Sequence, residues 1–366
     1  MIQIEHQIQF PQKYDLSKIG PAEKLLFFDI ETTGFSGDTA SVYLIGCVWN
    51  QKGRWHLTQW FADRRESEGE ILSAFFSQAG RFSTLVHFNG DTFDIPFLEK
   101  RCSRLKLSCS FDGLESMDIY RKIRPLKKLL GLSSLKQKAV EAFLGVERED
   151  VFSGGELIEV YSQYLRTRDE RLLKVLLLHN EDDLKGMPSI LPILSYADLM
   201  EGPFQLCSQQ AARGTQAQDR EISLLDLHYR SPISLPVSFQ AQSDWLKCRA
   251  EGAELYLQAL LYQGELKYFY PNYKDYYYLP YEDTAVHRSV GEYVDPEART
   301  RATAKNCYTR TSGLFLPQAS PIWSPALKRD YKDPLSFAAY RPELFQDQEK
   351  ASAYAVQALD YLKRQK

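Results

Sequence analysis

The sequence predicts two domains: an α/β domain with a mixed sheet flanked by helices, and then a smaller α+β domain with an antiparallel meander. The chain of 366 residues is long enough for two hydrophobic cores. Short apolar runs alternate with segments of helical periodicity up to about residue 200, and beyond residue 220 tyrosine-rich, strand-like runs prevail. We therefore assign residues 20–200 to the first domain, 201–220 to a linker and 221–366 to the second domain.

The first domain is predicted to begin with strands and to end with helices. Apolar runs predict strands at 25–30, 41–50, 55–62 and 83–90, with a possible strand at 113–120. Periodic apolar residues predict helices at 67–80 and 94–107, and a largely helical region from 125 to 200. A ribonuclease-H-like fold has this order of elements: three antiparallel strands, a helix, a further strand and then more helices.

The composition changes after residue 200. Residues 201–220 are rich in glutamine, alanine and glycine, which is typical of a linker. Residues 243–280 predict a β-meander with Gly252 and Gly264 at its turns. Helices are predicted at 295–310 and at 347–364.

Composition excludes several classes of protein. The net charge of -3 and the pI near 6.1 do not indicate a polyanion partner, so any nucleic-acid site must be a local basic patch. Six scattered cysteines without a CxxC pair argue against a zinc ribbon and a disulfide scaffold. There is no signal-like start and no apolar run near the ~20 residues that span a bilayer. We expect a cytoplasmic protein with no membrane partner.

Asp29 and Glu31 follow an apolar, aromatic run in FFDIETTG. Residues two apart on a strand project to one face, so the two carboxylates are expected to point the same way. Burying both without a partner would be costly. The pair therefore indicates either a solvated strand end or a cation site.

A further acidic position follows the predicted strand at 83–90. Asp94 stands at the start of a helix whose first turn contains Pro96. An Asp there could simply cap the helix. Asp91, beside Gly90, is predicted to be a turn residue.

The segment LLLHNEDDLKGM supplies the third acidic position. On a helix, His179 and Asp183 are four residues apart and share a face, near the apolar face that contacts the core. A histidine on a helix face can be structural rather than catalytic. Glu181 and Asp182 point elsewhere and are expected to be solvated.

Together these positions indicate chemistry based on hard cations. Oxygen-rich sites select Mg²⁺ or Mn²⁺, and two such ions ~3.5–4 Å apart can activate a water and stabilise a leaving oxygen of a phosphodiester. The sequence contains no P-loop, no dinucleotide-binding glycine fingerprint and no Gly-x-Ser-x-Gly motif.

Three segments, FFDIETTG, HFNGDTFDIPFL and HNEDDLKGM, resemble the exonuclease motifs of the DEDD superfamily, which has a ribonuclease-H-like fold. Their spacing is most similar to that of the YprB-like family of predicted exonucleases, over about residues 20–200. The resemblance implies that Asp29, Glu31, Asp94 and Asp183 bind two metal ions, Mg²⁺ or Mn²⁺, and that His179 is the general base.

The third motif departs from the superfamily pattern. One DEDD subgroup has Tyr four residues before the last Asp, and the other has His five residues before it. This chain has His179 at the tyrosine spacing, and the histidine spacing would require an Asp where Leu184 stands. Imidazole is a capable base near neutral pH, so activity is still expected.

Nucleic-acid contacts are predicted at two places. Within the motifs, Thr32 and Asn89 are candidates. Between the second and third motifs, a stretch without acids could contact phosphates or could be an ordinary solvated helix face. Its candidates for nucleic-acid binding are Arg121, Lys122, Arg124, Lys127 and Lys128.

The role of the second domain is open. Tyrosines beside lysines and arginines could stack unpaired bases, or could be half-buried strand residues.

The sequence therefore predicts a metal-dependent 3′→5′ exonuclease that acts on single-stranded ends of DNA or RNA. Two alternatives remain open: a structure-specific endonuclease on the same fold, and a nucleic-acid-binding protein with a weakened metal site.

Overall fold

Strand β2 (Leu25–Thr32) lies inside a six-stranded sheet of order β1-β4-β3-β2-β5-β6. It is antiparallel to β3 and parallel to β5, so the sheet is mixed. Nearly all of its residues are buried, because helices cover both faces of the sheet. The mixed sheet flanked by helices that the sequence predicts is thus confirmed. The other strands are β1 (Ile2–Ile8), β3 (Val42–Gln51), β4 (Arg54–Phe61), β5 (Thr84–His87) and β6 (Glu115–Asp118).

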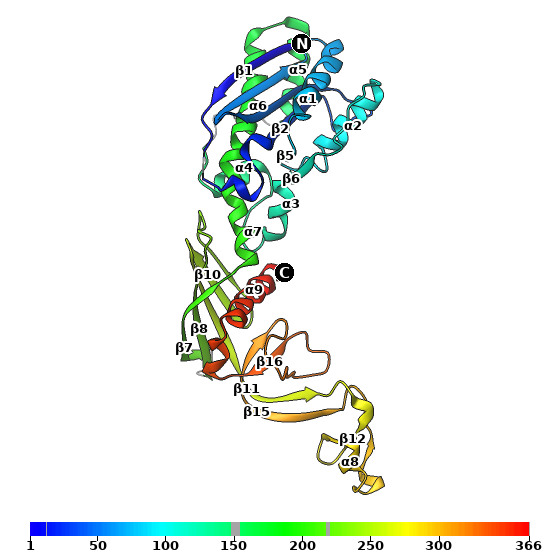
Figure 1. The fold of residues 1–366 in the computed structure, drawn as a ribbon, viewed down its shortest axis with the longest axis vertical. Helices are drawn as coiled ribbons and strands as arrows, with labels where there is room; N and C mark the ends of the chain where they lie inside the picture. Colours follow the sequence, from blue (N-terminus) through cyan, green and yellow to red (C-terminus); the bar gives the residue numbers. More distant parts are fainter. Residues whose placement is uncertain (12, 148–153, 217–219, 366) are drawn as a thin grey trace. The chain divides into compact units, whose positions relative to one another are not determined.

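This sheet belongs to the first of two units in the computed structural model, which describes residues 1–11, 13–147, 154–216 and 220–365 (Figure 1). The units are Met1–Ala197 and Asp198–Lys366. The first begins before residue 20, because β1 pairs with β4 along its whole length. That pairing depends on tertiary contact, so composition does not reveal it.

Two helices cover the sheet where it contributes to the site. Helix α1 packs on β3 and β4, and α6 packs on β2 and β3. Phe28 of β2 faces α1, with its ring centroid 5.3 Å from that of Phe75. Since strand residues alternate, Asp29 and Glu31 face α6 instead. The helices are α1 (Glu68–Ala79), α2 (Asp94–Arg104), α3 (Ile119–Ile123), α4 (Gln137–Phe143), α5 (Gly154–Thr167), α6 (Glu170–Ile190) and α7 (Leu194–Glu201).

Helix α6 approaches the sheet at a glycine. Gly46 of β3 pairs with Asp29 of β2. A Cβ atom at Gly46 would lie 2.1 Å from Asn180 Oδ1 and 2.4 Å from Leu184 Cδ1. Both atoms belong to α6, so the helix can reach this position only because residue 46 has no side chain.

The second unit contains a seven-stranded antiparallel sheet. Its longest strand, β11 (Glu254–Phe269), pairs with β8 and β10 in its first half and with β15 in its second half. The antiparallel sheet predicted for this part of the chain is confirmed. The other strands are β7 (Gln205–Gln216), β8 (Arg220–Arg230), β9 (Phe239–Gln242), β10 (Leu246–Glu251), β15 (Tyr308–Gln318) and β16 (Ser336–Ala339).

A three-stranded sheet and two helices complete this unit. The small sheet has the order β13-β12-β14. Helix α9 corresponds to the helix predicted at 347–364. The elements are β12 (Tyr276–Leu279), β13 (Thr284–His287), β14 (Thr300–Arg301), α8 (Arg288–Gly291) and α9 (Gln348–Arg364).

The structure differs from three expectations in the second half of the chain. The expected linker at 201–220 contains β7, whose side chains are mostly exposed because β7 pairs only with β8 in the described part of the sheet. Such a strand has the polar composition of a linker. The predicted turn at Gly264 lies within β11, opposite Gly313.

The helix predicted at 295–310 is reduced to a short 3₁₀ helix, Pro296–Ala298, in a segment that is described throughout. Thr300 and Arg301 pair with β12 instead, and Tyr308 begins β15.

Several tyrosines of the second unit form a small core. Tyr270, Tyr273, Tyr276 and Tyr278 are partly buried and pack around Ala285, Ala302 and Cys307. Their partial burial agrees with the simpler of the two interpretations, although only Tyr276 and Tyr278 lie in a strand, β12.

Replacing Gly46 with alanine should destabilise the first unit, because the new methyl group would push α6 from the sheet. Overpacking of this kind costs about 1–3 kcal/mol or more in the free energy of unfolding. Urea unfolding followed by circular dichroism measures it. Gly69→Ala is the matched control: no atom lies within 4 Å of a Cβ there, and alanine favours the helix. Equal midpoints for Gly46→Ala and the wild type would contradict this packing.

Candidate metal and nuclease site

The carboxylate of Asp29 is held by an amide on α6. Asn180 Nδ2 donates a hydrogen bond to Asp29 Oδ2 at 2.9 Å. Gln59 Nε2 of β4 donates to Asn180 Oδ1 at 3.0 Å and to the Leu177 carbonyl at 2.9 Å. Since Gln59 takes the oxygen of Asn180, the NH₂ group of Asn180 is directed at Asp29. The approach of α6 at Gly46 therefore fixes one side of the site.

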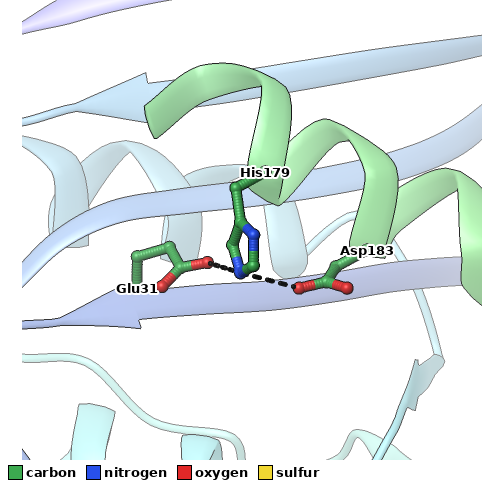
Figure 2. Close-up of side chains that lie close together, drawn as sticks. All are labelled: Glu31, His179 and Asp183. Carbon is green, nitrogen blue, oxygen red and sulfur yellow. Dashed lines mark ion pairs between the residues drawn. The ribbon is translucent and has the colours of Figure 1, made fainter. Parts of the chain in front are cut away.

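His179 lies between two further carboxylates (Figure 2). Its Nε2 atom is 3.4 Å from Glu31 Oε1 and 3.4 Å from Asp183 Oδ2. The three side chains form a group whose possible ligand atoms all lie within 4.8 Å of one another. His179 is 4% exposed and Glu31 is 8% exposed, whereas Asp183 is half-buried, so the group is largely withdrawn from solvent. The helical spacing of His179 and Asp183 thus faces the strand that carries Glu31.

Asp94 is the first residue of α2 and is buried. It is not the N-cap, a position taken by Phe93 without a side-chain hydrogen bond. The pKa of Asp94 is raised to about 7, mainly by burial and to a smaller extent by the negative charge of Asp118. Hydrogen bonds from the backbone of Asp94 itself and of Ile30 partly oppose this rise. The contact with Ile30 places Asp94 beside β2, between the positions of Asp29 and Glu31.

The other three predicted carboxylates act electrostatically on Asp29. Burial raises the pKa of Asp29 well above its ordinary value, and the charges of Asp183, Asp94 and Glu31 raise it further, in that order. The hydrogen bond from Asn180 lowers it in part. Like charges converging in a buried place require either protons or a cation. Carboxylate oxygens and one imidazole fit a hard divalent cation such as Mg²⁺ or Mn²⁺.

The residues predicted to bind nucleic acid are not members of this carboxylate group. Thr32 Oγ1 donates to the Gly34 carbonyl at 2.8 Å and shapes the loop after β2. Asn89 has a φ of 68° in the turn before α2. The basic side chains lie on α3 and on the turn after it. Four of them are exposed and Lys127 is half-buried; the exposed ones are Arg121, Lys122, Arg124 and Lys128.

A second acidic group lies at the ends of β5 and β6. His87, Asp91 and Asp118 place their possible ligand atoms within 4.8 Å of one another. Asp118 accepts hydrogen bonds from the backbone of Asn89, Asp91 and Arg121. Because hydrogen-bond donors surround it, we interpret this group as a structural network rather than a metal site.

Three residues of the site were not predicted. Asn180 resembles a solvated helix residue, and Gln59 resembles an ordinary strand residue. Only Gly46, a glycine inside an apolar strand, carried a usable signal, because such a glycine often marks the close approach of another element.

Comparisons with known proteins agree with the fold. A family profile described as the RNase H superfamily matches residues 26–194. The uncharacterized protein YprB of Bacillus subtilis (strain 168) is 26% identical over 172 residues, which cover 45% of this chain and 40% of that protein. The chain thus matches less than half the length of this relative.

Two solved structures are similar at a lower level. A family B DNA polymerase from the hyperthermophilic archaeon Pyrobaculum calidifontis is 13% identical with a TM-score of 0.39, covering 68% of this chain and 34% of the polymerase. A structure described as an ExoI/SSB-Ct complex is 12% identical with a TM-score of 0.27, and the match covers 57% of this chain and 55% of the chain in that structure.

Among the helices that the structure describes, none is both long enough and apolar enough to cross a membrane.

The pKa of Asp94 predicts a pH-dependent stability of the protein in a chelator. Its value is about 7 in the folded state, against 3.8 ordinarily, so the folded state binds more protons between these pH values. The free energy of unfolding should therefore fall as pH rises from about 4 to about 7, by at most ~1.4 kcal/mol per pH unit from this group. In Asp94→Asn this part of the pH dependence should be absent. At pH 8 the free energy of unfolding of Asp94→Asn should be higher than that of the wild type. Urea unfolding in EDTA from pH 4 to 8 measures both proteins, and parallel curves would contradict the assignment.

Proposed function

Residues 26–194 belong to the ribonuclease H superfamily, and on that premise we propose that this protein is a metal-dependent 3′→5′ exonuclease acting on single-stranded DNA or RNA. The observation that carries the proposal is the convergence of four carboxylates and one histidine from β2, α2 and α6 in a buried group. A fold needs no such group for its own stability, because like charges held together oppose folding. The group does suit the hydrolysis of a phosphodiester, because cations bound by the carboxylates would stabilise negative charge on the phosphate oxygens.

Asp29, Glu31, Asp94 and Asp183 would hold two Mg²⁺ or Mn²⁺ ions. When bound, such ions lower the pKa of water and stabilise negative charge on the oxygens of a phosphodiester. The protein's own contribution is orientation: Asn180 fixes Asp29, and the backbone of Ile30 fixes Asp94.

His179 is proposed as the general base. Its Nε2 atom points to the carboxylates, so a water close to them would be within reach of the imidazole. The imidazole comes from the helical turn before Asp183. Its reach therefore differs from that of a tyrosine at the same position.

The same geometry favours a second candidate function. The Nε2 atom of His179 is 3.4 Å from both Glu31 and Asp183, so a protonated imidazole could itself offset the two charges. In that case the protein would bind nucleic acid but bind metal weakly. Metal affinity and turnover together separate the two candidates.

Phe35 is a candidate for contact with the substrate. It lies four residues after Glu31, in the loop between β2 and β3, and is 89% exposed. Exposed aromatic rings stack on unpaired bases at about 1–3 kcal/mol per base. This observation favours a single-stranded substrate.

Asp29→Ala should lower the rate of nucleotide release by about 1,000-fold, because it removes a carboxylate from the metal group. His179→Ala should lower it by about 100-fold or more, as expected for the loss of a general base. The assay incubates the protein with uniformly labelled single-stranded DNA, duplex DNA or RNA in Mg²⁺ or Mn²⁺. Asp112→Ala, which removes an exposed aspartate elsewhere in the first unit, is the control.

The products decide between the alternatives. Release of mononucleotides supports an exonuclease, and longer internal fragments would indicate an endonuclease. Undiminished digestion by Asp29→Ala would refute the site. Tight nucleic-acid binding with weak Mn²⁺ binding and no turnover would support the second candidate. Full activity in His179→Ala alone would make His179 structural.

Phe35→Ala should raise the KM for a single-stranded oligonucleotide about 10-fold with little change in kcat, because stacking stabilises bound substrate and transition state alike. Phe35→Tyr should retain the wild-type KM, since it keeps the ring. Steady-state kinetics on a labelled oligothymidylate measures both. If alanine and tyrosine behave alike, the ring does not contact the substrate.

A further inference from the structure

A buried histidine begins a chain of hydrogen bonds at the ends of β5 and β6. His87 is 1% exposed. Its Nδ1 atom accepts a hydrogen bond from the Gly90 backbone at 3.0 Å, so this nitrogen carries no proton. The remaining nitrogen, Nε2, is 2.8 Å from Ser116 Oγ and donates to it. One tautomer of the ring is thereby selected by the backbone.

The chain continues to an arginine. The hydroxyl of Ser116 donates to Asp91 Oδ1, and Arg121 Nη1 donates to Asp91 Oδ2 at 2.6 Å. Burial alone would raise the pKa of Asp91, but the hydrogen bonds from Ser116 and Arg121 outweigh it, so the pKa lies below its ordinary value. Asp91 is therefore a charged anchor with both oxygens occupied.

The backbone joins this network to the proposed catalytic site. The carboxylate of Asp118 accepts from the backbone of Asn89 at 3.0 Å, of Asp91 at 3.3 Å and of Arg121 at 3.3 Å. In the same turn, the Ile95 backbone donates to the Gly90 carbonyl at 2.9 Å. Ile95 directly follows Asp94, so one turn carries both the anchor of Arg121 and a proposed metal carboxylate.

Arg121 is held at one edge and open at the other. Its side chain is 68% exposed although Nη1 is bound to Asp91. A guanidinium presents its donors as a rigid fork that matches phosphate oxygens. Lys122, Arg124 and Lys128 are also exposed, but within the described part of the chain no ion pair anchors them. Arg121 thus combines a fixed position with accessible donors.

We infer that Arg121 binds a backbone phosphate of the nucleic-acid strand, and that His87, Ser116 and Asp91 are positioning residues that hold it for this contact. The inference rests on the proposed function. It assigns to Asp91, which the sequence indicates only as a turn residue, the task of fixing the Arg121 cation on the turn that leads to the proposed metal carboxylate Asp94. The other exposed basic residues then contribute only general attraction to phosphates.

The direction in which Asp91→Asn changes nucleic-acid affinity shows whether Asp91 acts by positioning Arg121 or only through its charge. Asp91→Asn removes a negative charge, so by electrostatics alone it should strengthen binding to a polyanion. If Asp91 positions Arg121, the same substitution should weaken binding about 5-fold, because the guanidinium loses its anchor. Arg121→Ala should weaken binding about 10-fold and lower the slope of log affinity against log salt by about 0.7 for a single strand.

The experiment measures the affinity for a fluorescein-labelled decathymidylate by anisotropy, in an Asp29→Asn background so that the probe is not consumed. The double variant Asp91→Asn/Arg121→Ala should bind no more weakly than Arg121→Ala alone. Ser116→Ala should give a smaller loss in the same direction. Arg124→Ala is the control and should weaken binding about 2-fold. In the double variant with Asp91→Asn, the two losses of affinity should multiply, because the two residues act independently. Thermal unfolding verifies that each variant is folded.

The outcomes distinguish this inference from the proposed function. Tighter binding by Asp91→Asn, or effects of Asp91→Asn and Arg121→Ala that multiply, would overturn the positioning role. An unchanged affinity and salt slope in Arg121→Ala would overturn the phosphate contact, even if the wild type degrades the probe. A wild type that neither binds nor degrades single-stranded DNA or RNA would overturn the proposed function and this inference together.

Discussion

The contact of α6 with strand β3 at Gly46 is the constraint on which the site depends. A Cβ atom at Gly46 would lie 2.1 Å from the side-chain oxygen of Asn180, so any other residue there would displace the Asn180 side chain or the helix that carries it. Asn180 holds Asp29, and His179 and Asp183 lie on the same stretch of helix. A shift of α6 would therefore move three groups of the site at once, whereas Asp94 would keep its contact with the backbone of Ile30.

This contact also explains how buried carboxylates are tolerated. β2 alternates between an apolar face toward α1, represented by Phe28, and an acidic face toward α6, where Asp29 and Glu31 lie. The apolar face supplies core packing, which offsets the unfavourable desolvation of the acids. Asp29 and Asp94 then retain raised pKa values that a divalent cation would reverse, so metal binding and proton release are coupled.

Local pattern predicted the elements that carry the site but not the contacts between them. β2 and α6 have strong periodicity, so Asp29, Glu31, His179 and Asp183 could be placed on them from the sequence. Asn180 could not, because its role depends on the distance between two elements that are far apart in the chain. β7 was missed for a related reason: an exposed edge strand has no apolar alternation, and only its pairing with β8 identifies it.

Hydrogen bonds and an ion pair hold the loop that carries Phe35, so the exposed position of its ring is set by the fold. Arg101 forms a buried, bidentate ion pair with Glu68, with both distances 2.7 Å, and donates to the Gly37 carbonyl at 3.0 Å. Glu68 also accepts from the backbone of Val42 at 2.9 Å, so one ion pair joins α1, α2 and the loop between β2 and β3. A buried ion pair is weak evidence for stability, but it can specify one geometry. Thr32 Oγ1 donates to the Gly34 carbonyl before Phe35, so the loop is held on both sides of the ring and its exposure reflects where the fold places it. A single exposed ring is ordinary on a protein surface, so it is the position of Phe35 in a held loop, four residues after Glu31, that makes it a candidate for contact with the substrate.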